Sequence, residues 1–256
     1  MRAPLPADFR RLPLTHRGYH DRRHGIIENS LAAFGAAIAA GYGIELDVLL
    51  SRDGVVMVFH DDTLDRVTDR HGPVAALTAA ELGRIVLTGS NDTIPTLAAV
   101  LELVGGRVPV LVEMKDTSAA MAPTDGRLEQ ATAQVLAGYR GPVAVMSFNP
   151  HSIALMARLA PAVPRGIVVA GDVPGDWAPV PREVYAPITL VPDYDSSQSS
   201  FISHGVTDLD RPRVHELKAA GAAILCWTVR SPEMEAKARR VVDNITFEGY
   251  AAPIPA

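Results

Sequence analysis

Two acidic residues within an otherwise apolar segment are the first candidates for chemistry. Residues 44–62 read IELDVLLSRDGVVMVFHDD, with Glu45 and Asp47 two positions apart and His60 near the end. Side chains two positions apart on a strand face the same way, so the two carboxylates would share one face. The chain therefore places a pair of acids in a segment whose other residues favour burial.

A turn in the same segment brings His60 back toward the acids. The sequence SRDG (51–54) joins two apolar runs, and it is far too short for the crossover that parallel strands require. We therefore predict an antiparallel hairpin. If the hairpin is centred between Arg52 and Asp53, His60 lies opposite Glu45.

Two further apolar runs end in reactive side chains. His16 and Arg17 follow the first run, and the run VPVLVEMK ends with Glu113 and Lys115. Carboxylates that converge repel one another and have raised pKa values unless a positive charge lies between them. Mg2+ and Ca2+ both prefer such oxygen ligands, so the pattern predicts one divalent cation without choosing between the two. The carboxylates concerned are Glu45, Asp47 and Glu113.

Imidazoles and cations around such an ion suit the cleavage of a phosphate ester better than redox or acyl chemistry. His16 and His60 have the pKa range of a general acid and a general base near neutral pH. Arg17 and Lys115 supply positive charge, and arginine can hold a phosphate through two hydrogen bonds. Singly, each residue has an ordinary explanation, such as an ion pair between Lys115 and Glu113. We assign no role to the remaining histidines: His20, His24, His71, His151, His204 and His215.

The elements that must position these residues are short runs rich in Val, Ile and Leu, separated by helical patterns. This alternation indicates βαβ units and a parallel sheet whose strands are covered on both faces. The strand candidates are residues 12–18, 43–50, 54–60, 108–115, 141–148, 165–170, 187–193, 222–229 and 240–247. The helical patterns span residues 29–40, 96–104, 128–138, 150–159, 211–220 and 232–240, and Gly41 and Gly221 are placed to end two of them.

These nine runs are one too many for an eight-stranded barrel, and the hairpin accounts for the extra strand. We therefore predict an α/β fold, a (β/α)8 TIM barrel with 241–247 as its last strand, and rank a doubly wound open sheet second. Residues 1–256 would form a single domain with a small insertion at 61–93, in which 78–85 has a helical pattern. Loops are expected at 174–181 and 193–203. Active sites of such barrels lie at the carboxyl ends of the strands, where the candidate residues fall.

Composition agrees with an ordinary globular enzyme. Hydrophobic residues make up 48% of the 256 residues and charged residues 21%, and the net charge is −5. This balance argues against a general nucleic-acid-binding or anionic-membrane surface. No run approaches the roughly 20 apolar residues that cross a bilayer, and no secretory signal is recognised, so we expect a cytoplasmic protein without stable membrane insertion. The single cysteine, Cys226, is expected to be a buried thiol, and the oligomeric state stays open.

Taken in order, the motifs resemble those of the glycerophosphodiester phosphodiesterase family, of the PLC-like phosphodiesterase superfamily. The matching segments are His16-Arg17-Gly18, Glu28-Asn29-Ser30 with Phe34, Glu45 with Asp47, His60-Asp61, IPTLAAVLEL (94–103), VEMK (112–115) and CWTV (226–229). The resemblance covers nearly the whole chain and is most specific in its first half. It implies a barrel with a subdomain inserted after the His60-Asp61 motif.

The resemblance also implies an activity, the metal-dependent hydrolysis of a small glycerophosphodiester to a glycerol phosphate and an alcohol. The implied roles are a divalent cation on Glu45, Asp47 and Glu113, an acid–base pair of His16 and His60, and phosphate contacts from Arg17 and Lys115. One route that it implies begins with attack on phosphorus by the substrate's own glycerol hydroxyl. Water then opens the cyclic intermediate.

The chain departs from the family pattern in three places. Ile27 stands where a proline usually precedes Glu28. The final run, VVDNITFEGY, replaces a segment like GVDGIITD, which leaves the role of its acidic end, Asp243 to Glu248, open. The run GYHDRRHG (18–25) is unusually charged and bears on the choice of head group.

Two alternatives keep the barrel and change its function. A lysophospholipase D-like enzyme should have an apolar lip, and no exposed aromatic cluster is apparent in a chain with 5% aromatic residues. A non-catalytic phosphate-binding barrel should have lost at least one reactive residue. The residues concerned, His16, His60, Glu45, Asp47 and Glu113, are all present.

Overall fold

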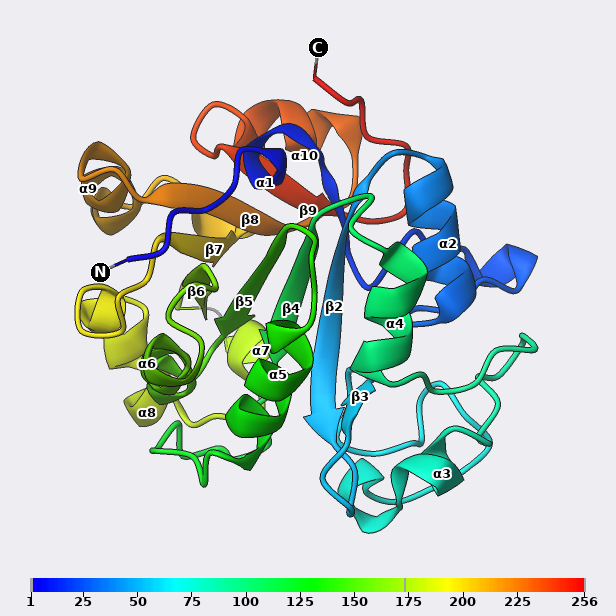
Figure 1. Ribbon diagram of the computed structural model, residues 1–256. Coiled ribbons are helices and arrows are strands. Elements are labelled where there is room, and N and C mark those ends of the chain that lie inside the picture. The colour runs from blue at the N-terminus through cyan, green and yellow to red at the C-terminus, as the bar shows by residue number, and fades with distance from the viewer. Residues whose placement is uncertain (1, 173, 256) are drawn as a thin grey trace.

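The structure is a computed structural model that describes residues 2–172 and 174–255, and within them one sheet closes into a barrel (Figure 1). The strand order is β1-β9-β8-β7-β6-β5-β4-β2-β3, and an additional pairing of β1 with β2 closes the ring. All neighbours are parallel except β2 and β3. The strands are β1 Leu14–Thr15, β2 Gly43–Leu50, β3 Val56–Val58, β4 Val110–Met114, β5 Val143–Ser147, β6 Arg165–Val169, β7 Phe201–Gly205, β8 Ala223–Val229 and β9 Asn244–Phe247. The predicted (β/α)8 barrel with one extra strand is confirmed.

Helices surround the barrel, and the six predicted from sequence are confirmed with ends that differ by at most two residues. Helix α2 begins after Ser30, whose hydroxyl accepts a hydrogen bond from the Ala33 N–H, and α4 begins after Thr96 in the same way. Gly41 and Gly221 follow helices with φ of 76° and 93°, the left-handed conformation that glycine adopts without strain. The helices are α1 Asp8–Arg11, α2 Leu31–Ala39, α3 Ala79–Leu82, α4 Leu97–Val104, α5 Arg127–Ala137, α6 Pro150–Leu159, α7 Pro174–Trp177, α8 Arg182–Ile188, α9 Pro212–Ala219 and α10 Pro232–Ala238.

The core has an interior layer and an outer layer. Alternate strand residues such as Leu111, Val168 and Leu225 pack inside the barrel, together with Phe9 of α1. The residues between them, such as Val112, pack outward against the helices. Because side chains alternate along a strand, the same periodicity directs Glu45 and Asp47 inward.

The hairpin of β2 and β3 is confirmed, with a register one residue away from the predicted one. Val48 pairs with Val58, and the Phe59 N–H donates to the Asp47 carbonyl oxygen over 3.0 Å. The turn is centred on Asp53, because Gly54 takes φ of 81° and the Ser51 N–H donates to the Val55 carbonyl oxygen. The placement of His60 directly opposite Glu45 was therefore wrong, although the hairpin still brings His60 to the acids.

One strand was assigned to the wrong segment. Residues 187–193 were predicted as a strand, but they lie at the end of α8, where Leu190 is 58% exposed. The seventh strand is instead Phe201–Gly205, which overlaps the loop predicted at 193–203. Its sequence FISHG has only two apolar residues, so it lacks the signal of a buried strand, and its parallel neighbours β6 and β8 hold it in place.

The predicted insertion after the His60-Asp61 motif is confirmed. Between β3 and α4 the chain forms short elements, including α3. Leu64, Leu82 and Leu87 of this segment share a hydrophobic cluster with Leu49 of β2 and Met57 of β3. It lies beside the end toward which the β2 arrow points in Figure 1. The loop predicted at 174–181 contains the short helix α7 in its described part.

The single cysteine, Cys226, was expected to be a buried thiol, and the structure confirms this. Burial raises the pKa of the Cys226 thiol to about 12.

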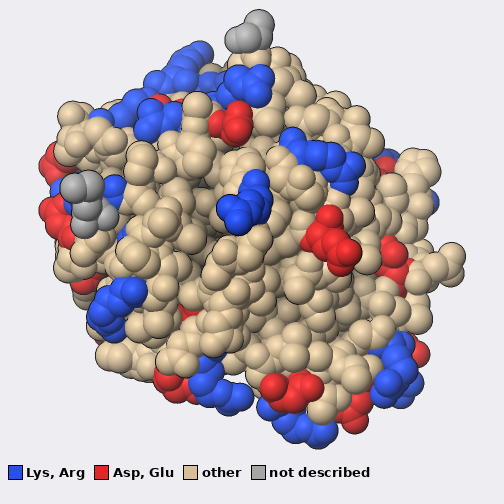
Figure 2. Space-filling model, in the orientation of Figure 1, with Lys and Arg blue, Asp and Glu red and all other residues tan. Residues whose placement is uncertain are grey.

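No helix in the described ranges is long and apolar enough to cross a membrane. On the face shown in Figure 2, acidic and basic residues are mixed over most of the surface, and basic residues gather along the upper left edge.

Candidate active site

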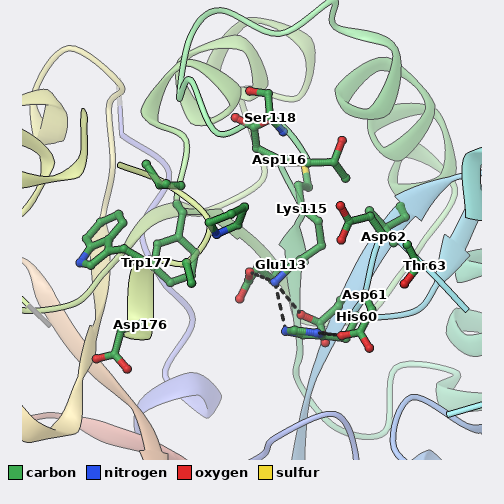
Figure 3. Close-up of a pocket in the computed structure, with 18 of the residues that line it drawn as sticks. His60, Asp61, Asp62, Thr63, Glu113, Lys115, Asp116, Ser118, Asp176 and Trp177 are labelled. Carbon is green, nitrogen blue, oxygen red and sulfur yellow. Dashed lines mark hydrogen bonds and ion pairs between the residues drawn. The ribbon is translucent and has the colours of Figure 1, made fainter. Parts of the chain in front are cut away.

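A cavity of about 590 Å³ opens where the barrel strands end, and most of the predicted site residues line it (Figure 3). They come from the ends of β1, β2 and β4 and from the segment after β3. The predicted residues on its wall are His16, Arg17, Asp47, His60, Glu113 and Lys115. The seventh, Glu45, is 2% exposed and lies next to them, where its Oε2 accepts a hydrogen bond from the Arg17 backbone N–H over 2.9 Å.

The three predicted metal ligands converge. Asp47 and Glu113 are register partners on adjacent strands, and Glu45 is two residues earlier on the same face of β2. Ligand oxygens of the three residues lie within 4.8 Å of one another, and all three residues are buried. Burial, together with the charges of Asp47 and Glu113, raises the pKa of Glu45 well above its ordinary value. The site therefore has an excess of buried negative charge that a cation would relieve.

Lys115 and Asn29 complete the surroundings of the carboxylates. Lys115 Nζ lies 2.9 Å from Glu113 Oε1 and 3.6 Å from Asp47 Oδ1. The Asn29 side-chain amide donates to Asp47 Oδ2 over 3.0 Å. Burial alone would raise the pKa of Asp47, but the nearby His60, Lys115 and other cations lower it below its ordinary value. The surrounding cations therefore favour the ionised form of Asp47.

His16 has a carboxylate partner that the sequence did not reveal. Its Nδ1 lies 2.5 Å from Glu248 Oε2, and Arg230 Nε donates to the other oxygen of Glu248 over 2.7 Å. Glu248 follows β9, the strand beside β1, so the acidic end of the final run has a place in the site. Burial lowers the pKa of His16 and outweighs the raising effect of Glu248. The pKa of Glu248 is lowered by His16 and His20 despite burial.

His60 has a similar partner. Its Nδ1 lies 2.6 Å from Asp61 Oδ1, and its Nε2 lies 3.3 Å from Lys115 Nζ. Because Lys115 also lies 3.6 Å from Asp47, His60 is separated from the acidic group by one ammonium group. Each predicted catalytic histidine therefore has one ring nitrogen held by a carboxylate, which leaves Nε2 for the cavity.

Arg66, from the insertion, connects the two sides of this network. Its guanidinium donates to Asp61 Oδ2 over 2.6 Å and to both oxygens of Glu28 over 2.7 and 2.8 Å. Glu28 in turn accepts from Arg17 Nη1 over 2.8 Å. Burial opposes the ionisation of Glu28, but Arg66 and Arg17 outweigh it and lower its pKa to about 2. The insertion therefore supports both His60 and the predicted phosphate contact, Arg17.

Arg17 is held in an unusual backbone conformation. Its φ is 56°, in the left-handed region that non-glycine residues seldom adopt. The Asn29 N–H donates to the Arg17 carbonyl oxygen over 2.8 Å, and the Arg17 N–H binds Glu45, so the strained residue is fixed on both sides. The following Gly18 has φ of 83°, and a Cβ there would lie 2.8 Å from the Ala33 side chain. This packing explains the glycine of the HRG motif.

The histidines without an assigned role lie mostly away from the cavity. His204 is buried, and its ring Nδ1 donates to the Gly205 carbonyl oxygen. His20 is the exception, since its Nε2 lies 3.7 Å from Glu248 Oε2. Surface acids pair with three others: His24 with Asp21, His71 with Asp65 and His215 with Asp210.

The far wall of the cavity is aromatic, which the sequence analysis did not anticipate. Phe148, Trp177 and Trp227 all line it. They come from the segments after β5 and β6 and from β8, so they are distant in sequence and meet only through the barrel. Because the chain contains few aromatic residues, its composition did not indicate that these three meet in one cavity.

Comparisons with known proteins identify the family of this chain. The model of the glycerophosphoryl diester phosphodiesterase family matches residues 16–248. A glycerophosphodiester phosphodiesterase of Caldanaerobacter subterraneus subsp. tengcongensis is 30% identical over 244 residues, which are 91% of this chain and 92% of the relative.

Two solved structures of phosphodiesterases share the fold of this chain. A phosphodiesterase of Oleispira antarctica, in complex with the product sn-glycerol-3-phosphate, superimposes with a TM-score of 0.76 at 25% identity over 93% of each chain. A glycerophosphodiester phosphodiesterase of Agrobacterium tumefaciens gives a TM-score of 0.67 at 25% identity over 91% of this chain and 94% of the other. Since the family match extends from the HRG motif to Glu248, the chain belongs to the glycerophosphoryl diester phosphodiesterase family.

Proposed function

We propose that this protein hydrolyses glycerophosphodiesters to a glycerol phosphate and an alcohol, using a divalent cation and two histidines. The observation that carries the proposal is the pair of carboxylate-bound histidines beside a buried group of three carboxylates. Family membership supports the same reaction, and the relative from Oleispira antarctica binds sn-glycerol-3-phosphate as its product.

The carboxylates fit a hard divalent cation. Glu45, Asp47 and Glu113 offer only oxygen donors, and burial together with the charges of Asp47 and Glu113 raises the pKa of Glu45. When bound there, a cation would neutralise the carboxylates and act as a Lewis acid toward the phosphate. The donor set suits Mg2+ and Ca2+ equally.

The histidines would divide the proton transfers. His16, whose pKa burial lowers, is neutral at neutral pH and would accept the proton of the attacking hydroxyl at Nε2. His60 would give a proton from Nε2 to the oxygen of the leaving alcohol. Arg17 and Lys115 would hold the phosphate, which would draw Lys115 away from His60. As the substrate's glycerol hydroxyl oxygen bonds to phosphorus, the phosphorus–oxygen bond to the alcohol breaks. Water would then attack the cyclic phosphate and give a proton to His60, while the phosphorus–oxygen bond to the glycerol oxygen breaks and His16 returns a proton to that oxygen.

The first test is hydrolysis of glycerophosphocholine before and after exhaustive dialysis against EDTA. Activity should disappear with the metal and return with Mg2+ or Ca2+. Glu45→Gln should lower activity by at least about 100-fold and weaken metal binding measured by calorimetry, with an unchanged circular dichroism spectrum. Full activity after chelation would contradict the proposed cation.

The second test separates the two histidines. His16→Ala and His60→Ala should each lower kcat on the order of 100- to 10,000-fold. A diester with a p-nitrophenol leaving group needs no general acid, so it should restore the rate of His60→Ala and leave His16→Ala impaired. A loss of only a few-fold in both variants on the natural substrate would refute the acid–base assignment.

The aromatic wall favours one second candidate, lysophospholipase D-like cleavage. An acyl chain on the glycerol needs apolar surface, and Phe148 and Trp227 supply some within the cavity. Lysophosphatidylcholine belongs in the same assay series, and a higher kcat/KM for it than for glycerophosphocholine would select this candidate.

A further inference from the structure

The cavity has two unlike halves, and the half opposite the carboxylates is a corner of aromatic rings. The ring centroids of Phe148 and Trp227 lie 5.5 Å apart with planes 81° apart. Trp177, itself 2% exposed, packs on Phe148 from behind at 5.2 Å and stacks on Tyr185 at 5.1 Å. Phe148 and Trp227 are both half-buried and line the cavity, so their remaining surface is available to a ligand.

A carboxylate stands beside this corner. Asp176 lines the same cavity and, within residues 2–172 and 174–255, has no hydrogen-bond or ion-pair partner. A Cβ built at Gly205 would lie 3.8 Å from Asp176 Oδ2, and Gly205 is the register partner of Trp227 on the next strand. In Figure 3, Asp176 and Trp177 lie on the side of the cavity away from His60 and Asp61.

The charges around the cavity favour a positively charged group in this half. The acids on its wall are Asp47, Asp61, Asp62, Asp65, Glu113, Asp116 and Asp176, and the strong bases are Arg17, Arg66 and Lys115. All three bases contact the carboxylate network of the polar half. None of these three bases forms an ion pair with Asp176, and its neighbours in the described lining include the apolar residues Trp177 and Val180.

We infer that Phe148, Trp227 and Asp176 bind the leaving alcohol of the substrate and select a quaternary ammonium alcohol of the choline class. A trimethylammonium group has no hydrogen to donate, so it is recognised by the negative faces of aromatic rings and by charge. An aromatic corner with one unpaired carboxylate has this chemistry. The inference rests on the proposed function, since it assigns the second half of the cavity to the alcohol that the first half releases.

The test compares two substrates that differ only in charge. Glycerophosphocholine and the glycerophosphodiester of 3,3-dimethylbutan-1-ol share phosphate, glycerol and shape, but only the first carries a cation. Their kcat/KM ratio should favour choline by about tenfold, as expected for a partly desolvated cation–π contact with a nearby carboxylate. If neither compound is hydrolysed, the result contradicts the proposed function, and the inference about choline is then tested by binding.

Binding keeps the inference testable in that case. Choline should quench the fluorescence of Trp227 with a lower Kd than 3,3-dimethylbutan-1-ol, and the difference should again be about tenfold. This measurement needs neither metal nor turnover. Equal affinity for the two alcohols would overturn the inference.

Single substitutions test which side chains produce the preference for choline. Asp176→Asn should reduce the choline preference to about threefold or less, and Trp227→Leu, which keeps apolar volume without a ring, should reduce it similarly. Asp62→Asn is the matched control, because Asp62 lines the same cavity, also lacks a side-chain partner among the described residues and lies on the opposite side. If Asp62→Asn lowers the ratio as much as Asp176→Asn, the preference comes from the general negative charge and the proposed subsite is wrong.

Discussion

At the scale of single residues, each histidine of the proposed acid–base pair has a carboxylate that holds its ring. Glu248 holds Nδ1 of His16 at 2.5 Å, and Asp61 holds Nδ1 of His60 at 2.6 Å. A carboxylate in this place fixes the tautomer and the orientation of the imidazole and supports its charged form. We therefore propose that Glu248 is a positioning residue whose carboxylate acts through His16.

Glu248→Gln should therefore change both the rate and its pH dependence. The amide cannot hold the ring as well, so kcat should fall at least about tenfold. Glu248 raises the pKa of His16, so its removal lowers that pKa and moves the acidic limb of the kcat/KM profile to lower pH. Arg230→Met is the control, because Arg230 is exposed and contacts only the other oxygen of Glu248. A profile that does not move would show that Glu248 has a purely structural role.

Glu28 should make stability depend on pH. Its pKa is lowered from 4.5 to about 2 in the folded protein, because Arg66 and Arg17 bind it. A depressed carboxylate pKa stabilises the folded state above the unfolded value, and this stabilisation is lost as pH falls from about 4.5 toward 2. The stabilisation is on the order of 3 kcal/mol. Urea unfolding of Glu28→Gln and the unchanged protein should thus differ most near pH 6 and converge toward pH 2, whereas a constant difference would contradict this account.

At the scale of elements, the insertion after β3 contributes a side chain to the network around the candidate active site. Arg66 is its contribution, and it binds Asp61 and Glu28 at the same time. The first contact supports His60, and the second supports Arg17. The insertion therefore joins the side of the site proposed for proton transfer to the side proposed for phosphate binding.

Arg66→Met should lower kcat and raise KM, each by a factor of about three to ten, because both supports are lost. Arg66→Lys keeps the charge without the forked geometry and should recover only part of the loss. Arg70→Met, an exposed arginine of the same insertion, is the control and should behave like the unchanged protein. Steady-state kinetics with glycerophosphocholine measure all three, and equal effects of Arg66→Met and Arg70→Met would contradict the role of Arg66.

The elements also show how far sequence patterns extend. Buried strands such as β4 and β5 are recognised in the sequence as apolar runs. The SRDG turn predicts the hairpin because it is too short for a crossover between parallel strands. The strand β7 could not be found in this way, because Ser203, His204 and Gly205 interrupt its apolar character. Its position is a tertiary property, set by two parallel neighbours.

The same limit applies to the site. The seven predicted residues could be named because they lie in short motifs at or near the ends of recognisable strands. Glu248 and the corner of Phe148 and Trp227 are brought to the cavity only when distant strands close into one barrel. These residues can be assigned to the site only when the order of the strands in the barrel is known. The sequence alone indicated the strand ends at which such residues would lie.

At the scale of the whole molecule, the barrel has a seam where its first and last strands meet. Strand β1 has only two residues, Leu14 and Thr15, and they pair with β9 on one side and β2 on the other. The His16 N–H donates to the Phe247 carbonyl oxygen across this seam over 2.8 Å. The first residue of the HRG motif and its carboxylate partner thus come from opposite ends of the chain.

This seam makes enzymatic activity a reporter of the last stage of folding. Both tryptophans, Trp177 and Trp227, lie in the β6–β8 half of the barrel, so their fluorescence follows that half and not the seam. Contacts between chain ends cost the most loop entropy and form late. During refolding from urea, tryptophan fluorescence should therefore recover before catalytic activity does, in stopped samples assayed at matched times. A molecule that regained activity first would have aligned His16 with Glu248 before its barrel had formed.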